Sequence, residues 1–236
     1  MTAVYKRELR SYFTSMVGYV FIAILIFFVG IYFMAYNLFG GYPSFGYVLL
    51  SCTIIFMVAV PILTMRSMAE DRRGKTDQLL LTAPVSLTQM VMGKYLAAVS
   101  VFTVALLCSL IYPLAMAIFG NPAWGEILTS YVGCFLLGAS LVALGMFLSS
   151  LTDSQAIAAV TTLVVIMLLY VANMMTPYLN ISWLSTIISW FSIYSRYDPF
   201  YAGRLDLPAI IYFISFSAVF VFLTIRTVEK RRWSEG

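Results

Sequence analysis

The sequence has no histidine and few charged residues. Only 10% of its 236 residues are Asp, Glu, Lys or Arg, whereas 62% are hydrophobic. Soluble domains are about a quarter charged and about half apolar, and a water-soluble fold of this length could not bury so many apolar side chains. The lipid bilayer is therefore the expected solvent for most of the chain.

The lack of histidine removes the commonest general base, proton shuttle and metal ligand. Cys52, Cys108 and Cys134 lie in apolar runs without C-x-x-C or metal-ligand spacing, so we expect them to pack as small apolar residues. A membrane enzyme is disfavoured, because we see no base or buried acid pair to activate a nucleophile. We therefore expect no catalytic, metal-binding or cofactor-binding residue on this chain.

Long apolar runs dominate the sequence. A spanning helix needs about 20 mostly apolar residues. Six runs meet this requirement, at 17–38, 46–65, 95–119, 129–150, 156–175 and 207–226. They predict an all-α polytopic membrane protein with one transmembrane domain over 1–236. A channel or ion-coupled carrier is disfavoured, because such proteins place ionisable groups at mid-membrane and none of these runs has a charge in its middle.

The basic residues predict the orientation in the membrane. Of the 14 Lys and Arg residues, only Arg196 and Arg204 lie between the fifth and sixth runs; the other 12 lie before the first run, between the second and third, or from the end of the sixth run onward. Lys and Arg collect in cytoplasmic loops. Both termini and the 66–94 loop are therefore expected on the cytoplasmic side of a multi-pass protein of the cytoplasmic membrane.

Residues 1–16 have the pattern of an amphipathic helix. One face is apolar and the other is basic, with Tyr5, Leu9, Tyr12, Phe13 and Met16 on the first face and Lys6, Arg7 and Arg10 on the second. Such a helix lies in the membrane interface with its basic face toward anionic lipid headgroups. The simpler alternative is a positively charged anchor.

The fourth and fifth runs carry small and polar residues. In the fourth, Ala139, Ala143, Gly145 and Ser149 would let neighbouring helices approach closely, which predicts a helix packed inside the bundle. In the fifth, the polar residues are expected to bond to a neighbouring helix or to their own backbone, with a pore-lining role as the alternative: Thr161, Thr162 and Asn173.

The segment 176–206 is long, aromatic and only half-hydrophobic. Its central part, 181–193, is too short and too polar to span the bilayer. We expect it to dip into the outer leaflet, with Trp183, Trp190 and Tyr194 at headgroup level.

The most charged stretch is SMAEDRRGKTDQLLLTAPVS, at 67–86, and it contains the end of a phosphate-loop motif, GKT. A phosphate loop needs another glycine five residues before Gly74, where this chain has Ala69, and a preceding strand, where this chain has a membrane helix. Nucleotide binding by this loop is therefore rejected.

A helical interpretation fits this stretch better. The second membrane helix is predicted to continue to Arg73 and to break at Gly74; a short helix capped by Thr76, with Asp77 in its first turn, would follow and end at Pro84. Leu79, Leu80 and Leu81 give it an apolar surface. The sequence 86–89 is a capping box that begins the next helix. The short helix is either a docking piece for a partner or a solvated loop.

The same stretch resembles a known family. EDRRGKTDQLLLTAPVSLTQMVMGKYLA resembles the loop of ABC transporter type-2 permeases, and most closely that of the gliding-motility-type permease subunit of bacteria. The N-terminal VYKRELRSYFTSMVGYVF is similar to the same family. The stretch PFYAGRLD, before the last run, resembles it more loosely. The resemblance covers the whole chain.

The resemblance implies a permease subunit of an ATP-driven exporter, in which ATP and Mg²⁺ bind to a separate ATPase chain. Residues 1–16 would form the connecting helix, 66–94 would carry the coupling helix, and 176–206 would form a re-entrant pair of half-helices. Two ATPase copies would join two permeases, identical or paralogous. An auxiliary membrane protein with an extracytoplasmic domain is a further implied partner, and nucleic acid is not.

The resemblance also implies roles for particular residues. Those in contact with the ATPase would be Glu70, Asp71, Arg72, Arg73, Gly74, Thr76, Asp77, Leu79, Leu80, Leu81 and Pro84. The outer gate would contain Trp183, Trp190, Tyr194, Arg196, Asp198, Pro199, Phe200 and Arg204. One alternative keeps this architecture: a mechanotransmitter that passes ATPase work to an extracytoplasmic partner and moves no substrate, with the aromatic outer segment as its binding surface.

Overall fold

Helices of membrane-spanning length make up most of the described chain. The structure is a computed structural model that describes residues 1–73, 86–120, 122–175 and 192–234. These ranges contain no strand, and their helices follow in this order: α1 (Thr2–Thr14), α2 (Val17–Phe33), the π-helix η1 (Met34–Phe39), α3 (Gly46–Cys52), α4 (Phe56–Arg73), α6 (Leu87–Ser109), α7 (Ile111–Phe119), α8 (Trp124–Ser149), α9 (Gln155–Met175), α11 (Asp198–Tyr201) and α12 (Leu207–Ser234).

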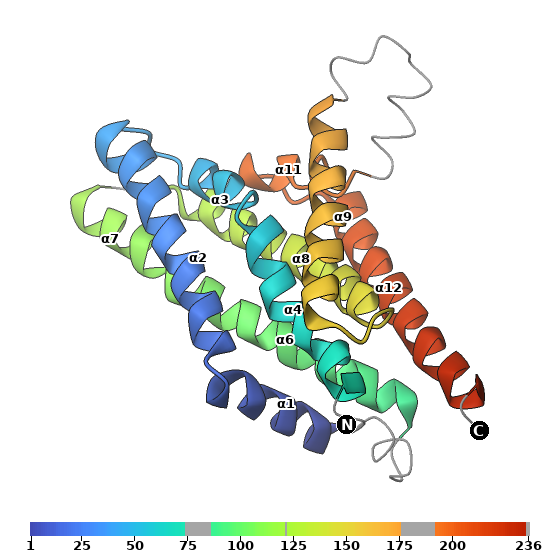
Figure 1. Cartoon of the computed structure of the whole chain (residues 1–236). Coiled ribbons are helices and arrows are strands. Elements are labelled where there is room, and N and C mark those ends of the chain that lie inside the picture. Colours follow the sequence, from blue (N-terminus) through green and yellow to red (C-terminus); the bar gives the residue numbers. More distant parts are fainter. Residues whose placement is uncertain (74–85, 121, 176–191, 235–236) are drawn as a thin grey trace.

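The described helices confirm the prediction of an all-α polytopic membrane protein. Five unbroken stretches are long and apolar enough to cross a bilayer: Val17–Phe39, Leu87–Ile118, Trp124–Ser149, Gln155–Met175 and Leu207–Lys230. The pair α3 and α4, bent by 56°, makes a sixth candidate. The two termini lie near the same end of the bundle (Figure 1).

The break between α3 and α4 differs from the single helix expected over 46–65. Around the break, N–H groups bond to carbonyls three residues back, as from Ile55 to Cys52 at 2.9 Å and from Val58 to Ile55 at 3.0 Å. The Thr53 hydroxyl also donates to the Leu50 carbonyl at 2.7 Å. Side-chain competition for a carbonyl and a tight turn of this kind are ordinary causes of a change in helix direction.

Helix α8 lies at the centre of the bundle, with α4, α6, α9 and α12 packed around it. Its small residues permit this packing. A Cβ atom on Gly138 would overlap the ring of Phe102 on α6, and one on Gly145 would overlap Thr64 on α4. Ala143 and Ser149 are fully buried. The prediction that the fourth run packs inside the bundle is confirmed.

Helix α1 lies across one end of the bundle, against α6 and α2 (Figure 1). Its apolar face is the predicted one: Tyr12 is buried, and the Tyr5 hydroxyl lies 2.9 Å from the Ser100 hydroxyl on α6. Lys6, Arg7 and Arg10 are exposed, as expected. Met16 was wrongly placed on the apolar face. It is 73% exposed because its left-handed backbone (φ 60°) ends α1 and turns the chain into α2.

Two of the polar residues predicted on the fifth run bond to their own helix. Thr161 donates to the Ile157 carbonyl at 2.8 Å, and Thr162 donates to the Ala158 carbonyl at 2.7 Å. Both hydroxyls are therefore hydrogen-bonded within α9, so a pore-lining role is not required to account for either polar side chain.

Replacing Gly138 by Ala should destabilise the bundle by about 1–3 kcal/mol, because the added methyl group overlaps the Phe102 ring in a closely packed core. The measurement is the thermal unfolding midpoint of the purified protein in detergent. Gly125→Ala is the matched control, since a Cβ atom there meets nothing within 4 Å. Equal midpoints for the two variants would contradict the packing described here.

Candidate functional site

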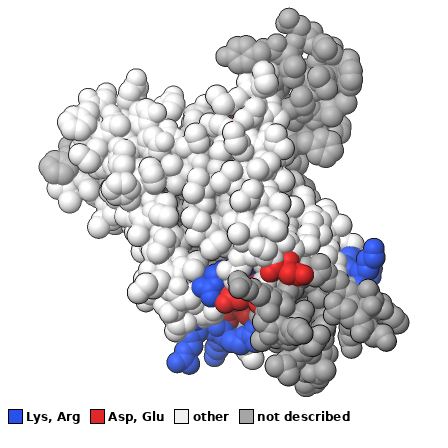
Figure 2. Space-filling view, in the orientation of Figure 1, with Lys and Arg blue, Asp and Glu red and all other residues white. Residues whose placement is uncertain are grey.

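Charged side chains gather at the end of the molecule that holds both termini. Figure 2 shows Lys, Arg, Asp and Glu together at this end, while the rest of the described surface in that view carries no charge. The end of α4, the start of α6, α1 and the end of α12 lie at this end of the bundle (Figure 1). We call this region the charged end.

A buried lysine joins three helices at the charged end. Lys94 on α6 is 2% exposed, and its Nζ donates to the Ser67 carbonyl of α4 at 2.6 Å. The same Nζ lies 3.5 Å from Glu8 Oε1 on α1. One side chain therefore holds α4 and α1 to α6.

Lys94 was grouped with the other basic residues of the 66–94 loop, and its burial was not predicted. Val91 and Ala97, three residues before and after Lys94, are both buried. Residues three apart on a helix share a face, so this spacing was the signal that Lys94 faces the protein interior.

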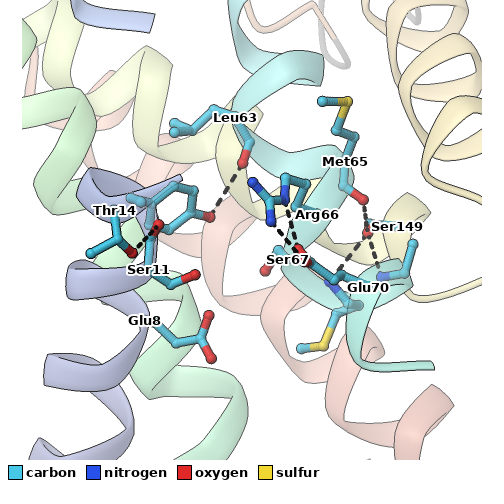
Figure 3. A network of polar contacts seen from close by, with 12 residues as sticks. Glu8, Ser11, Thr14, Leu63, Met65, Arg66, Ser67, Glu70 and Ser149 are labelled. Carbon is cyan, nitrogen blue, oxygen red and sulfur yellow. Dashed lines mark hydrogen bonds and ion pairs between the residues drawn. The ribbon is translucent and has the colours of Figure 1, made fainter. Parts of the chain in front are cut away.

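Tyr12 makes a second bond between α1 and α4. Its hydroxyl donates to the Leu63 carbonyl at 3.2 Å. Burial raises the pKa of Tyr12, so the phenol keeps its proton and remains a donor. One turn further along α4, Arg66 donates to Glu70 from Nε at 2.6 Å and from Nη2 at 2.7 Å, the two-bond geometry that suits a carboxylate (Figure 3).

Ser149, at the end of α8, bonds into the backbone of α4. Its hydroxyl donates to the Met65 carbonyl at 3.2 Å and accepts the N–H groups of Met68 at 3.3 Å and Ala69 at 3.2 Å (Figure 3). Ser149 is fully buried. The central helix α8 is thus fixed to the same turn of α4 that carries Ser67.

The residues expected to contact an ATPase fall at or beyond the end of α4. Glu70 is described and pairs with Arg66, and 71–73 form the last turn of the helix. The remaining ones lie outside the described residues: Gly74, Thr76, Asp77, Leu79, Leu80, Leu81 and Pro84.

The helix before these residues extends as far as predicted, and the helix after them begins as predicted; the predicted break at Gly74 lies outside the described residues. Helix α4 continues to Arg73, and α6 is capped by Ser86, whose hydroxyl accepts the Gln89 N–H at 3.3 Å. Because a helix and not a strand precedes GKT, the structure agrees with the rejection of a phosphate loop.

The predicted outer-gate residues that the structure describes lie at the end of the bundle opposite the charged end. Phe200 is buried against Gly133 of α8 and Phe213 of α12, and Pro199 and Asp198 stand beside it in the short helix α11. Trp183 and Trp190 lie outside the described residues.

The other three differ from one another in exposure. Tyr194 is buried, Arg204 is exposed, and the Arg196 guanidinium stacks on the Tyr212 ring of α12, 5.5 Å from its centre.

Comparison with protein families decides what kind of membrane protein this is. The model of a family described as ABC-2 family transporter protein matches residues 33–226, from the end of α2 to the last turns of α12. The chain belongs to this ABC-2 transporter family. It is therefore an ABC permease subunit, a kind of membrane chain that works with an ABC ATPase, and the resemblance to type-2 permeases is confirmed at this level. None of the curated proteins matches the chain.

Replacing Lys94 by Met in the permease should lower its stability by about 1–3 kcal/mol, because the Ser67 carbonyl and the Glu8 carboxylate lose a charged donor inside the protein. The thermal unfolding midpoint in detergent measures this. Lys230→Met is the control, because Lys230 is an exposed lysine at the same end.

A double-mutant cycle then tests whether the ion pair is real. Glu8→Gln and Lys94→Met should be non-additive by at least about 0.5 kcal/mol, as expected for residues in direct contact. Additive effects would show that Glu8 and Lys94 do not interact.

Proposed function

We propose that this chain is the permease subunit of an ATP-driven ABC type-2 exporter of the cytoplasmic membrane, and that its ATPase docks on the charged end. The family implies an ABC ATPase partner in general terms. The segment 74–85 joins α4 to α6 at the charged end, and its three leucines and its charges suit a protein contact. The basic residues of this end favour a cytoplasmic location.

The observation that carries the proposal is the Lys94 contact. Segment 74–85 is flanked by α4 and α6, and Lys94 ties these two helices together three turns or less from the segment. A movement imposed on the segment is therefore shared by both helices instead of being lost in one of them.

Further bonds extend this connection into the bundle. Tyr12 and Glu8 link α4 and α6 to α1, and Ser149 links α4 to the central helix α8. In this proposal the linked helices move together as one piece, and the ATPase favours one arrangement of this piece within the transporter when it binds ATP and another after hydrolysis. The difference between its affinities for the two arrangements supplies the free energy of transport.

The proposal includes the wider assembly. ATP and Mg²⁺ bind to the ATPase chain, two ATPases join two permeases that are identical or paralogous, and α1 lies at the lipid headgroups. Within the family, the 70–97 stretch most resembles the gliding-motility-type subgroup, whose permeases often act with an auxiliary membrane protein.

The docking surface is tested by replacing Leu79 and Leu80 together with Ser. If both side chains are buried against the ATPase, the ATPase that copurifies should fall by tenfold or more, because burying one Leu contributes about 1.5–3 kcal/mol and about 1.4 kcal/mol changes an affinity tenfold. The measurement is the ATPase-to-permease ratio, with ATP hydrolysis, after purification from the native host in mild detergent.

The matched control carries the same two substitutions at the other end of the bundle, Leu205→Ser with Leu207→Ser, where both side chains are exposed. Arg72→Glu with Arg73→Glu tests the charged part of the same surface. The docking proposal fails if the Leu79–Leu80 variant and the arginine variant both retain the ATPase and its turnover.

A further inference from the structure

A cavity of about 370 Å³ lies at the end of the bundle opposite the charged end. Four parts of the chain form its wall: the end of α2 with η1, the break between α3 and α4, the last turns of α9, and residues 194–198. Its volume lies within the range of about 300–1,000 Å³ that is usual for small-molecule sites.

The wall is aromatic and acidic. Its described lining residues include five tyrosines and one carboxylate and no Lys or Arg: Tyr32, Tyr36, Tyr170, Tyr194, Tyr197 and Asp198. Ring contacts hold four of the tyrosines in place. Tyr32 stacks with Tyr36 at 6.2 Å between ring centres, and Tyr170 meets Tyr194 edge to face at 5.1 Å.

Two polar groups in this wall have no partner within the described chain. Tyr194 is 5% exposed, yet its hydroxyl makes no hydrogen bond there. Leaving a buried hydroxyl unpaired usually costs free energy, so such a group calls for an explanation.

The second group is the Asp198 carboxylate, with which no described residue forms an ion pair or hydrogen bond. Asp198 is exposed as a residue, but partial burial of its carboxyl group raises the pKa above its ordinary value, so the carboxylate lies in the cavity wall with part of its surface still in water. The neighbouring Arg196 does not neutralise it, because its guanidinium lies on Tyr212.

We propose that this cavity binds a ligand through a protonated amine. An ammonium group can donate hydrogen bonds to the Asp198 carboxylate and the Tyr194 hydroxyl, and tyrosine rings attract cations. An anionic ligand would be repelled by Asp198, and the described wall has no basic residue to offset that repulsion. A neutral ligand would leave the Asp198 carboxylate without a counter-charge. The amine comes from a lipid headgroup such as phosphatidylethanolamine or from a free small molecule.

The test uses the whole permease in nanodiscs of phosphatidylglycerol, without the ATPase, so that its result is separate from the docking proposal. The probes are phenethylamine and 2-phenylethanol, which have the same ring and chain but differ in the ammonium group. Calorimetry should show the amine binding at least about tenfold more tightly than the alcohol, since hydrogen bonds to charged groups are the stronger ones. Empty nanodiscs give the background.

Substitutions place the amine within the cavity. Asp198→Asn should weaken amine binding about tenfold, and Tyr194→Phe should weaken it severalfold. Asp206→Asn should leave amine binding unchanged. This substitution also removes one negative charge, but Asp206 lies near α12 and does not line the cavity. Unfolding midpoints identify any variant that has lost its fold. If Asp198→Asn does not fold, the amine affinity of Tyr194→Phe tests the proposal in its place.

Three results would overturn the proposal: no binding of the amine, equal affinity for amine and alcohol, or amine binding that neither cavity substitution weakens. The same titration in nanodiscs that contain phosphatidylethanolamine distinguishes the two sources. Weaker phenethylamine binding there indicates that the lipid headgroup occupies the cavity, and unchanged binding indicates a free amine.

Discussion

The charge of Lys94 constrains the whole charged end. An ammonium group that is 2% exposed must have acceptors inside the protein, because burying an unpaired charge is very costly. Its acceptors come from two other helices, the Ser67 carbonyl on α4 and the Glu8 carboxylate on α1. Separating α4 from α6 would leave the charge short of a partner, so the two helices that flank segment 74–85 are held as one piece.

The rest of the bundle depends on close packing more than on charge. In a bilayer the hydrophobic effect does not drive helices together, so association relies on small residues and on interhelical hydrogen bonds. Helix α8 has both: Gly138 and Gly145 allow close approach, and Ser149 and Ser140 bond to α4 and α12. The opposite end differs, because there a cavity lined by tyrosines interrupts the packing. One end is thus closely bonded and the other is open to a ligand.

Hydrophobic runs of membrane length predicted the helices well, because the bilayer fixes how long an apolar segment must be. Local rules also predicted the continuation of α4 to Arg73 and the Ser86 cap of α6. Features that depend on tertiary contacts were missed. Lys94 resembled any other loop lysine, and the bend at Thr53 comes from a tight turn and one hydroxyl bond within an apolar run. The cavity joins tyrosines from three separate segments, which no pattern along the chain brings together.

The most direct test of the central claim is a distance measurement between α1 and α6 in the permease–ATPase complex. Spin labels at Arg10→Cys and Gln89→Cys, two exposed positions, would be placed in a background with Cys52, Cys108 and Cys134 replaced by Ala. If Lys94 holds the charged end together, the distance will be the same with and without ATP, and Lys94→Met will broaden its distribution. A distance that changes with nucleotide while Lys94 is intact would contradict the account.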